Sequence, residues 1–470
     1  MNAPLAVFDL GKTNSKLFVF SPAGDIIAEE RTAPRWRDHG GMKVLDDVQL
    51  YDWMRTALAD AIERHGVGGV MFSGHGCTFA LVSDGALTHP ILDYEQDPPE
   101  DIAQRIETLL PDFAETYSPR LPLGLNFSRH LLWLEEAAPA AMDQARHILS
   151  YLQFRSWRFS GVPVSEISYL GCHSHLWAPL EQDFSSLVEA RGWREKMPPR
   201  ARAGVVLGST EITLPSGKKS PVNVHNGVHD SNAALHCYRA AGHESFTLVS
   251  SGTWVIIFNA ECPLDTLDEK RDMLANVSVD GVPTPTIRFM GGREFDLIRN
   301  GAPLDLTPEA LQAVIDRGQF ALPSFAAGGP VPETAGEILG SFTSPTERTA
   351  LALLYIVLMT DLALDLIGSQ NTVIIDGGLI KTGFYVETLA QLRPRQTFLS
   401  GDNPEGSATG AAILAYEAMG HSVEPVHCAE AKPTSLSGLD DYRARWRAMV
   451  EERRGRASQA SGEIMTGGAA

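Results

Sequence analysis

The sequence predicts an α/β fold with two domains of one class, and three observations support this prediction. Three glycine-bearing turns follow or interrupt β-branched strands, in VFDLGKTNSKLFVF, TLVSSGTWVIIF and TVIIDGGLI. The first two segments share one design, a strand, a turn of small residues and a returning strand, which indicates an internal duplication. Strands alternate with helical patterns, as in an α/β sheet. A chain of 470 residues is also too long for a single hydrophobic core.

The first domain is expected over residues 1–242. Its expected elements, in order, are a hairpin over 6–20, a helix over 50–64, a strand over 70–72, a hairpin turning at 84–85, helical segments over 128–157 and a helix opening at GVHDSNAA. The strand that returns from the turn at 84–85 would end at Asp93 and Glu95. It would therefore deliver two carboxylates to the sheet edge.

The second domain is expected over residues 243–435. It should contain a helix over 345–367, a strand over 372–376 and a helix of small residues in PEGSATGAAILAYEAMG. Each repeated hairpin would face phosphate, so we expect a nucleotide in the cleft between the two domains. Residues 436–470 begin as a charged helix and decay into Gly, Ala and Ser, so we expect the last dozen to be disordered.

Composition excludes several classes of protein. The net charge of −19 argues against a nucleic-acid partner, because binding to a phosphate backbone needs clustered Lys and Arg. The five cysteines are odd in number and form no CxxC pair, which indicates reduced thiols and a cytoplasmic protein. We find neither a signal peptide nor a run of about eighteen apolar residues, so no membrane partner is expected. A homodimer remains open.

Several segments together resemble the FGGY carbohydrate kinases, members of the actin, hexokinase and Hsp70 superfamily of two-domain ATP-binding folds. They are DLGKTNSKL, GVHDSNAA, SSGTW, DGGLIKTGFYVETLAQ and PEGSATGAAILA. DLGKTNSKL and SSGTW resemble the family's two phosphate hairpins, GVHDSNAA its catalytic segment, and the last two segments its adenosine-binding end. LANVSVDG followed by MGG resembles rhamnulokinase, which indicates the rhamnulokinase- and fuculokinase-like branch. The resemblance implies two actin-like (ribonuclease H-like) domains.

The first hairpin has the chemistry of a phosphate site, because its glycine lets backbone N–H groups approach an anion. The residues expected to bind the γ-phosphate are Gly11, Lys12, Thr13, Asn14 and Lys16. Asp9 is expected to orient Mg²⁺, through water. The alternative is structural: Asp9 and Asn14 would stabilise a turn, and Lys16 would be a solvated strand residue.

Asp230 is the expected general base, accepting the proton of a sugar hydroxyl as its oxygen attacks phosphorus. The alternative is a helix cap, since Asp230 opens a predicted helix and Asp is a favoured capping residue. The two roles are compatible, because a helix N-terminus keeps the carboxylate ionised. His229 beside it can hydrogen-bond a sugar hydroxyl, although a single histidine is more often structural.

The second and third glycine turns are expected to hold the rest of the nucleotide. Ser251, Gly252 and Thr253 would bind the β- and α-phosphates. Gly377 and Gly378 remove side chains where adenine or ribose would pass the backbone. An asparagine and a glutamine usual in the family are replaced here by Thr382 and Glu387, which puts the adenine contacts in doubt.

The sugar site is expected to draw on polar side chains that converge on a cleft. The candidates are His75, Asp93, Glu95, His229, Asp230, Asn276 and Arg293. Each has the alternative of being a turn or surface residue. The tryptophan and aspartate usual at the family's sugar hairpin are replaced by LDYEQ, which argues against copying a xylulose or glycerol assignment.

The sequence therefore predicts an ATP- and Mg²⁺-dependent kinase for a small-molecule sugar. The first substrates to consider are ketoses or deoxyketoses such as L-rhamnulose and L-fuculose, with another pentose or polyol as the alternative. A second class is a sensor on the same fold, in which nucleotide and sugar change domain closure without phosphorylation. A third, a chaperone-like ATPase, would need an added peptide-binding domain, and the short tail offers none.

Overall fold

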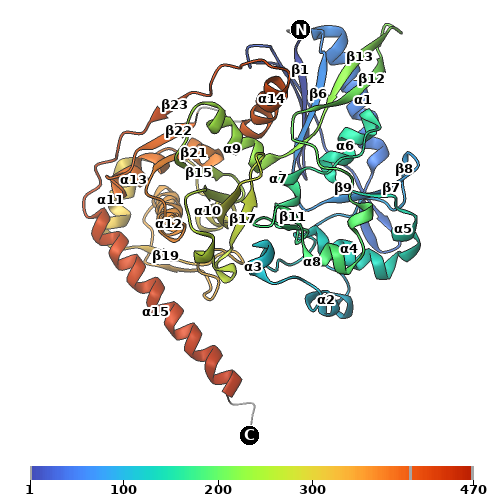
Figure 1. Cartoon of the computed structure of the whole chain (residues 1–470). Helices are drawn as coiled ribbons and strands as arrows, with labels where there is room; N and C mark the ends of the chain where they lie inside the picture. Colours follow the sequence, from blue (N-terminus) through green and yellow to red (C-terminus); the bar gives the residue numbers. More distant parts are fainter. Residues whose placement is uncertain (1–2, 402–404, 467–470) are drawn as a thin grey trace. The chain divides into compact units, whose positions relative to one another are not determined.

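The computed structural model describes residues 3–401 and 405–466, and its internal contacts divide the chain into two compact units (Figure 1). Unit 1 comprises Met1–His243, Ala275–Thr284 and Glu405–Val426, and unit 2 comprises Glu244–Leu274, Pro285–Pro404 and His427–Ala470. The first division lies one residue beyond the expected boundary. Two segments that the sequence placed in the second domain pack instead with unit 1, because a compact unit need not be continuous along the chain.

The main sheet of unit 1 mixes parallel and antiparallel pairs. Its order is β12 (Val206–Thr213), β13 (Lys219–His225), β6 (Gly69–Gly74), β1 (Leu5–Leu10), β2 (Ser15–Phe20) and β3 (Ile26–Thr32), with β14 (Val228–His229) also paired to β6. β1 runs antiparallel to β2 and parallel to β6. This arrangement confirms the expected first hairpin and the α/β class.

Side chains of β1 alternate between the two faces of this sheet. Phe8 and Leu10 join a core that includes residues of α1 (Asp47–His65) and α6 (Tyr151–Ser160). Val7 joins the opposite core, with residues of α9 (Asp230–Ala240) and α14 (Gly406–Ala418). Asp9 follows Val7 by two residues, so it shares the α9 and α14 face.

Helix α14 packs closely on α9 because its small residues allow it. A side chain at Gly410 would collide with the backbone oxygen of Ala233. This contact between the two helices holds the segment Glu405–Val426 in unit 1.

The remaining elements of unit 1 form smaller sheets and a helical layer. The strands are β4 (Trp36–His39), β5 (Met42–Leu45), β7 (Phe79–Ser83), β8 (Ala86–Leu87), β9 (His147–Ser150), β10 (Trp177–Ala178) and β11 (Asp183–Phe184). The helices are α2 (Glu100–Glu107), α3 (Phe113–Thr116), α4 (Phe127–Ala137), α5 (Pro139–Gln144), α7 (Ile167–Leu170), α8 (Ser186–Ala190) and the 3-10 helix η1 (Arg194–Lys196).

Two sequence expectations for unit 1 need correction. The strand returning from the turn at 84–85 is only the two-residue β8, and the chain continues irregularly to Asp93, whose backbone N–H donates to the Lys43 carbonyl. The helical pattern over 128–157 is interrupted by β9, which pairs with β7. Its apolar run is buried on both sides, and periodicity alone does not separate such a strand from a helix.

Unit 2 repeats the design of unit 1 at its centre. The sheet order is β17 (Met273–Val277), β18 (Pro283–Phe289), β16 (Val255–Asn259), β15 (Phe246–Ser251), β21 (Thr372–Gly377), β22 (Phe398–Gly401) and β23 (Cys428–Glu430). β15 is antiparallel to β16 and parallel to β21, as β1 is to β2 and β6. The shared pairing pattern matches the duplication predicted from the two hairpin sequences.

The other elements of unit 2 are mostly helices. They are α10 (Gly291–Arg299), α11 (Pro308–Arg317), α12 (Pro345–Leu366), α13 (Tyr385–Leu392), α15 (Leu439–Thr466), the 3-10 helices η2 (Leu264–Thr266), η3 (Glu269–Arg271) and η4 (Gly378–Thr382), and the strands β19 (Phe320–Leu322) and β20 (Glu337–Leu339). By length and composition α12 passes the test for a membrane span, but 83% of its most apolar window is buried inside the protein. The sequence reading overlooked this apolar stretch, which is a core helix.

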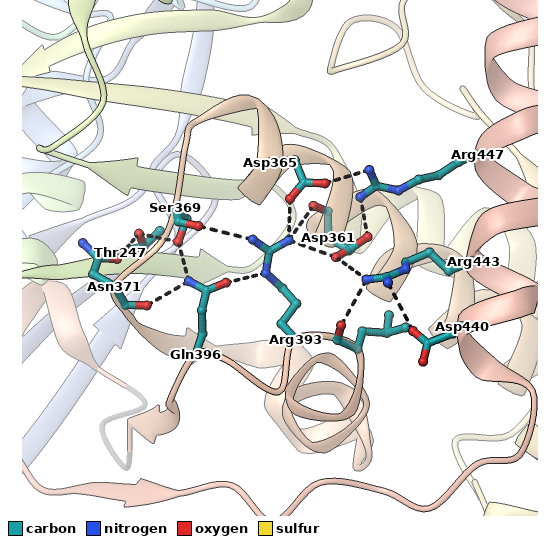
Figure 2. Close-up of polar contacts among 11 residues, drawn as sticks. Thr247, Asp361, Asp365, Ser369, Asn371, Arg393, Gln396, Asp440, Arg443 and Arg447 are labelled. Carbon is teal, nitrogen blue, oxygen red and sulfur yellow. Dashed lines mark hydrogen bonds and ion pairs between the residues drawn. The ribbon is translucent and has the colours of Figure 1, made fainter.

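A buried charge network joins α12 to α13 and α15 within unit 2 (Figure 2). The Asp361 side chain is fully buried and pairs with Arg393 at 3.0 Å, Arg443 at 3.6 Å and Arg447. Asp365 pairs with Arg393 and Arg447, each at 2.7 Å. Two carboxylates therefore meet three guanidinium groups, and the buried charges are compensated.

Helix α15 continues to Thr466, so most of the tail expected to be disordered is helical. Its first turns are anchored by the buried side chains of Leu439, Tyr442, Trp446 and Val450, and Figure 1 shows the helix at the C-terminal end of the chain. Residues 467–470 lie outside the described residues.

Candidate active site

The first hairpin of unit 1 brings Asp9 and Lys16 together as register partners on one face of the sheet. Lys16 Nζ donates to both carboxylate oxygens of Glu405 at 2.9 Å, and Ser407 Oγ donates to Asp9 at 3.4 Å. Burial, followed by the negative charge of Asp230, raises the pKa of Asp9 to about 7, although Lys16 opposes the shift. Asp9 therefore lies where negative charge is only partly compensated.

This excess of negative charge suits a divalent cation. No group of three or more His, Cys, Asp or Glu side chains forms a metal site among the described residues. Mg²⁺, however, is usually held by one or two carboxylates together with water and substrate phosphates. Asp9, with Asp230 close enough to shift its pKa, fits that requirement.

The turn after β1 exposes Thr13 and Asn14 and leaves Gly11 half-buried. Lys12, expected at the phosphate, extends instead to Asp93, with which it forms an ion pair. Backbone N–H groups and the Thr13 hydroxyl of this turn can therefore meet an anion, whereas the Lys12 ammonium is engaged elsewhere.

Asp230 is the first residue of α9, and the capping position itself belongs to His229. Its side chain is 34% exposed, and its carboxylate accepts a hydrogen bond of 2.6 Å from the Ser231 N–H. Burial raises the pKa of Asp230 to about 6, against that hydrogen bond. The carboxylate is thus accessible, mostly ionised at pH 7, and more basic than an ordinary aspartate.

His229 lies beside this carboxylate, with its Nε2 at 3.3 Å from Asp230 Oδ1. Burial lowers the pKa of His229 to about 4, so the ring is neutral at pH 7. Its Nδ1 contacts Asn232 Nδ2 at 3.1 Å, and its Nε2 contacts Cys172 Sγ at 3.3 Å. These contacts fix the ring and leave Asp230 without a cationic neighbour there.

His75 belongs to the same region of unit 1. Its ring stacks on Tyr151 with centroids 5.0 Å apart and tilts toward Tyr94 at 5.1 Å. Burial lowers the pKa of His75 to about 4, and the charges of Lys12 and His229 add to this effect. Burial also raises the pKa of Tyr94, with smaller contributions from neighbours that include Asp230. Both rings therefore lie within electrostatic reach of Lys12, and Tyr94 also lies within reach of Asp230.

The chain after β8 supplies Asp93 and Glu95. Asp93 is fully buried and pairs with Lys43 at 2.7 Å as well as with Lys12. Glu95 is half-exposed and lies 3.5 Å from Lys12 Nζ. Both carboxylates thus lie near Lys12, but on an irregular segment and not at the end of the expected strand.

Unit 2 contains a cavity of about 520 Å³ at its own glycine turns. It is lined by Gly252, Thr253, Gly292, Arg293, Phe295, Asp296, Leu297, Gly378 and Leu379. Gly377 adjoins it with φ +97°, and any side chain there would collide with the Ser251 oxygen. Glycine is required at this crossing, where the turns after β15 and β21 touch.

Two expected nucleotide-binding residues, Ser251 and Thr382, are engaged inside unit 2. Ser251 Oγ donates to the Asp376 carbonyl at 2.6 Å, and Thr382 Oγ1 donates to the Leu379 carbonyl at 2.6 Å. Glu387 lines a different cavity, of about 670 Å³. Gly252, Thr253 and Gly378 therefore remain the residues with most direct access to the smaller cavity.

The two other sugar-site candidates are Arg293 and Asn276. Arg293 belongs to the cavity of unit 2. Asn276 is a buried residue of β17, in the segment Ala275–Thr284 that packs with unit 1.

The sequence did not predict several residues of both regions, namely Trp36, Tyr94, Glu405, Ser407, Gly292 and Asp296. PEGSATGA had been assigned as a whole to the adenosine end, so its Glu405 and Ser407 were not considered near Asp9. Pro404 of that segment lies outside the described residues.

Comparisons with known proteins agree with this arrangement. Residues 243–424 match the family described as "Carbohydrate kinase FGGY, C-terminal domain". The structure resembles a carbohydrate kinase from Novosphingobium aromaticivorans, with 33% identity, a TM-score of 0.84, and coverage of 96% of this chain and 99% of that one.

More distant structures show the same fold. A xylulose kinase from Lactobacillus acidophilus has 14% identity and a TM-score of 0.76, covering 98% of this chain and 100% of that one. A glycerol kinase from Plasmodium falciparum, solved with ADP, has 11% identity and a TM-score of 0.77, covering 96% and 98%. A comparison with curated proteins gave no match. The chain belongs to the FGGY carbohydrate kinase family, with two actin-like α/β domains.

Proposed function

We propose that this protein transfers the γ-phosphoryl group of ATP to a sugar hydroxyl, with Asp230 as the general base. The supporting observation is the Asp230 carboxylate itself, one-third exposed, with a pKa raised to about 6 by burial and a neutral His229 beside it. A base works best when its pKa lies near the operating pH. An ordinary capping aspartate would be a weaker base.

The chemical step follows from this assignment. The sugar hydroxyl oxygen attacks the γ-phosphorus while Asp230 accepts the hydroxyl proton. The bond from phosphorus to the bridging oxygen of ADP breaks, and ADP leaves with that electron pair. The products are a sugar phosphate, ADP and a proton that Asp230 later releases to water. Asp9 would hold Mg²⁺, which neutralises phosphate charge when bound.

Each unit has its own proposed phosphate contacts. In unit 1, the backbone of residues 11–14, the Thr13 hydroxyl and Lys16 are the proposed partners of the γ-phosphate. In unit 2, Gly252, Thr253, Gly377 and Gly378 surround the space for the remaining phosphates and the nucleoside. Arg293 lines that cavity, so we assign it to the nucleotide rather than to the sugar.

For the sugar we keep ketoses or deoxyketoses as the first candidates, with L-rhamnulose and L-fuculose first. His75, His229 and Asp230 lie close together in unit 1, which supports their role in sugar binding. Asn276 and Thr382 remain predicted sugar and nucleotide residues, respectively. The names of related structures include xylulose, gluconate and glycerol kinases, so a pentose, a sugar acid and a polyol belong in any screen. A cytoplasmic location and a homodimer remain predictions.

The test is a coupled ADP-release screen of sugars with ATP and Mg²⁺, run on the wild type, Asp230→Ala and Asp60→Ala. Asp60 is the matched control, because its side chain is 35% exposed, against 34% for Asp230. We expect turnover of one or two sugars, a loss of about 10²- to 10⁴-fold in kcat for Asp230→Ala, and no change for Asp60→Ala. If nucleotide binds but no sugar is phosphorylated, a sensor role replaces the kinase.

A further inference from the structure

We propose that Lys12 is a sugar-binding residue, fixed by Asp93 to donate hydrogen bonds to a neutral polyhydroxyl substrate, rather than a ligand of the nucleotide phosphates. This inference rests on the proposed sugar kinase function and defines the substrate class of that site. Lys12 follows Gly11 in the first turn, so its sequence position alone predicts a phosphate contact. Its side chain, however, takes another direction.

The Lys12 ammonium is held on several sides within unit 1. It pairs with the fully buried Asp93, and it lies 4.1 Å from the ring centroid of Trp36 and 4.8 Å from that of Tyr94. Only 13% of the Lys12 side chain is exposed. A lysine immobilised in this way loses little further conformational entropy on binding a ligand.

The surroundings of Lys12 suit a sugar. Trp36 and Tyr94 are half-buried aromatic rings, which can pack against the apolar C–H face of a sugar, as aromatic side chains commonly do in ligand sites. Tyr94 also lies within electrostatic reach of Asp230, and His75 within reach of Lys12. Tyr94 is thus a neighbour of both Lys12 and the proposed base.

The charge of this cluster indicates a neutral substrate. Lys12 and Lys43 face Asp93 and Glu95, so two ammonium groups are balanced by two carboxylates. The adjacent rings of His75 and His229 are neutral, because burial lowers the pKa of each to about 4. Arg155, behind Tyr151, pairs with Asp47. A sugar carboxylate would find each of these cations already paired.

The experiment compares Lys12→Met with Lys43→Met. Lys43 is the matched control, because it is the other lysine that pairs with Asp93 and its side chain is 53% exposed. Turnover and calorimetric binding without nucleotide are measured with L-rhamnulose, L-fuculose, D-xylulose, glycerol and D-gluconate. We expect Lys12→Met to raise the KM and Kd for the preferred neutral sugar by about tenfold to a hundredfold, because a charged hydrogen bond is lost. The KM for ATP should stay within about twofold, and Lys43→Met should leave both constants within about twofold.

Three results would overturn the inference: a raised KM for ATP with unchanged sugar binding, an equal effect of Lys43→Met on sugar binding, or a preference for D-gluconate. Lys12→Met leaves Asp93 without one partner and can unfold the protein. The second variant therefore combines Lys12→Met with Asp93→Asn, and we expect it to weaken sugar binding as much as Lys12→Met alone. A failure of the kinase proposal gives a different result, because the wild type then phosphorylates no sugar. Calorimetry still measures the effect of Lys12 on sugar binding in that case.

Discussion

Two groups of carboxylates, one in each unit, differ in how far their charge is compensated. In unit 2, Asp361 is fully buried and meets Arg393, Arg443 and Arg447 (Figure 2). In unit 1, the charge of Lys16 lowers the pKa of Asp9, but Lys16 is itself bound to Glu405, and the pKa of Asp230 is lowered only by hydrogen bonds from Ser231. The first group is compensated, whereas the pKa of each aspartate in the second is raised by burial.

The difference separates structural from functional charge. A buried charge that is fully paired fixes the packing of the helices around it and has no capacity left for a ligand. Carboxylates held without sufficient positive charge raise the free energy of the folded protein, but they can bind a cation or accept a proton. Surrounding charge, more than burial alone, therefore distinguishes the two groups.

The largest effect on stability is expected from Asp361→Asn. The substitution keeps the shape of the side chain but leaves Asp365 as the one carboxylate that faces both Arg393 and Arg447, so the free energy of unfolding should fall by about 3 kcal/mol. Urea unfolding monitored by fluorescence measures this loss. Asp440→Asn is the control, because Asp440 pairs with Arg443 at 3.1 Å while 78% exposed, and its loss should cost less than about 0.5 kcal/mol. Equal losses would show that the network does not carry the stability assigned to it.

The arginines of the charge network around Asp361 should contribute unequally to the free energy of unfolding. The side chain of Arg393 is 10% exposed and contacts both Asp361 and Asp365, whereas that of Arg443 is 30% exposed. We expect Arg393→Met to cost about 2 kcal/mol and Arg443→Met about 0.5 kcal/mol in the same unfolding assay. The reverse order would mean that the anchoring of α15 matters more than burial of the pair.

The pH dependence of catalysis tests the functional group in unit 1. Asp230 must be ionised to accept a proton, and its pKa is about 6. We therefore expect kcat/KM to rise with pH, by about tenfold per unit below pH 6, and to level off above pH 7. Initial rates between pH 5 and pH 8 at saturating Mg²⁺ measure this profile. A rate independent of pH down to pH 5 would contradict the assignment of Asp230.

The smallest expected effect is a gain in stability from Asp9→Asn. The pKa of Asp9 is raised from 3.8 to about 7 in the folded protein, so folding favours its protonated form, and this contribution is lost as pH rises from about 4 to 7. Removing the charge should raise Tm by about 1–3 °C at pH 8 and leave it unchanged at pH 4. Thermal unfolding at both pH values, without nucleotide or Mg²⁺, measures the difference. A lower Tm at pH 8 would mean that Asp9 is a structural residue like Asp361.

Local patterns predicted much of the fold. The two hairpins, α1 and α12 follow from periodicity and turn residues close in the sequence, and the structure confirms them. The sequence predicted a helix where the structure has β9, because a short buried apolar run fits either a strand or a helix. The sequence placed α14 in the second domain, whereas α14 packs with unit 1, because the contact of Gly410 with Ala233 joins residues far apart in the chain.

The features of the candidate site also divide into those that the sequence predicts and those that only the structure shows. The sequence by itself determined the glycine turns, the class of chemistry and the identity of Asp230 as the candidate base, because these depend on residue type and short spacing. Only the tertiary structure decided that Lys12 turns to Asp93, that Arg293 lines the cavity at the glycine turns of unit 2, and that Glu405 joins Lys16. The physical reason is that the pKa and the partner of a charged group depend on every charge and dipole within a few ångströms, and chain folding brings those neighbours from distant positions.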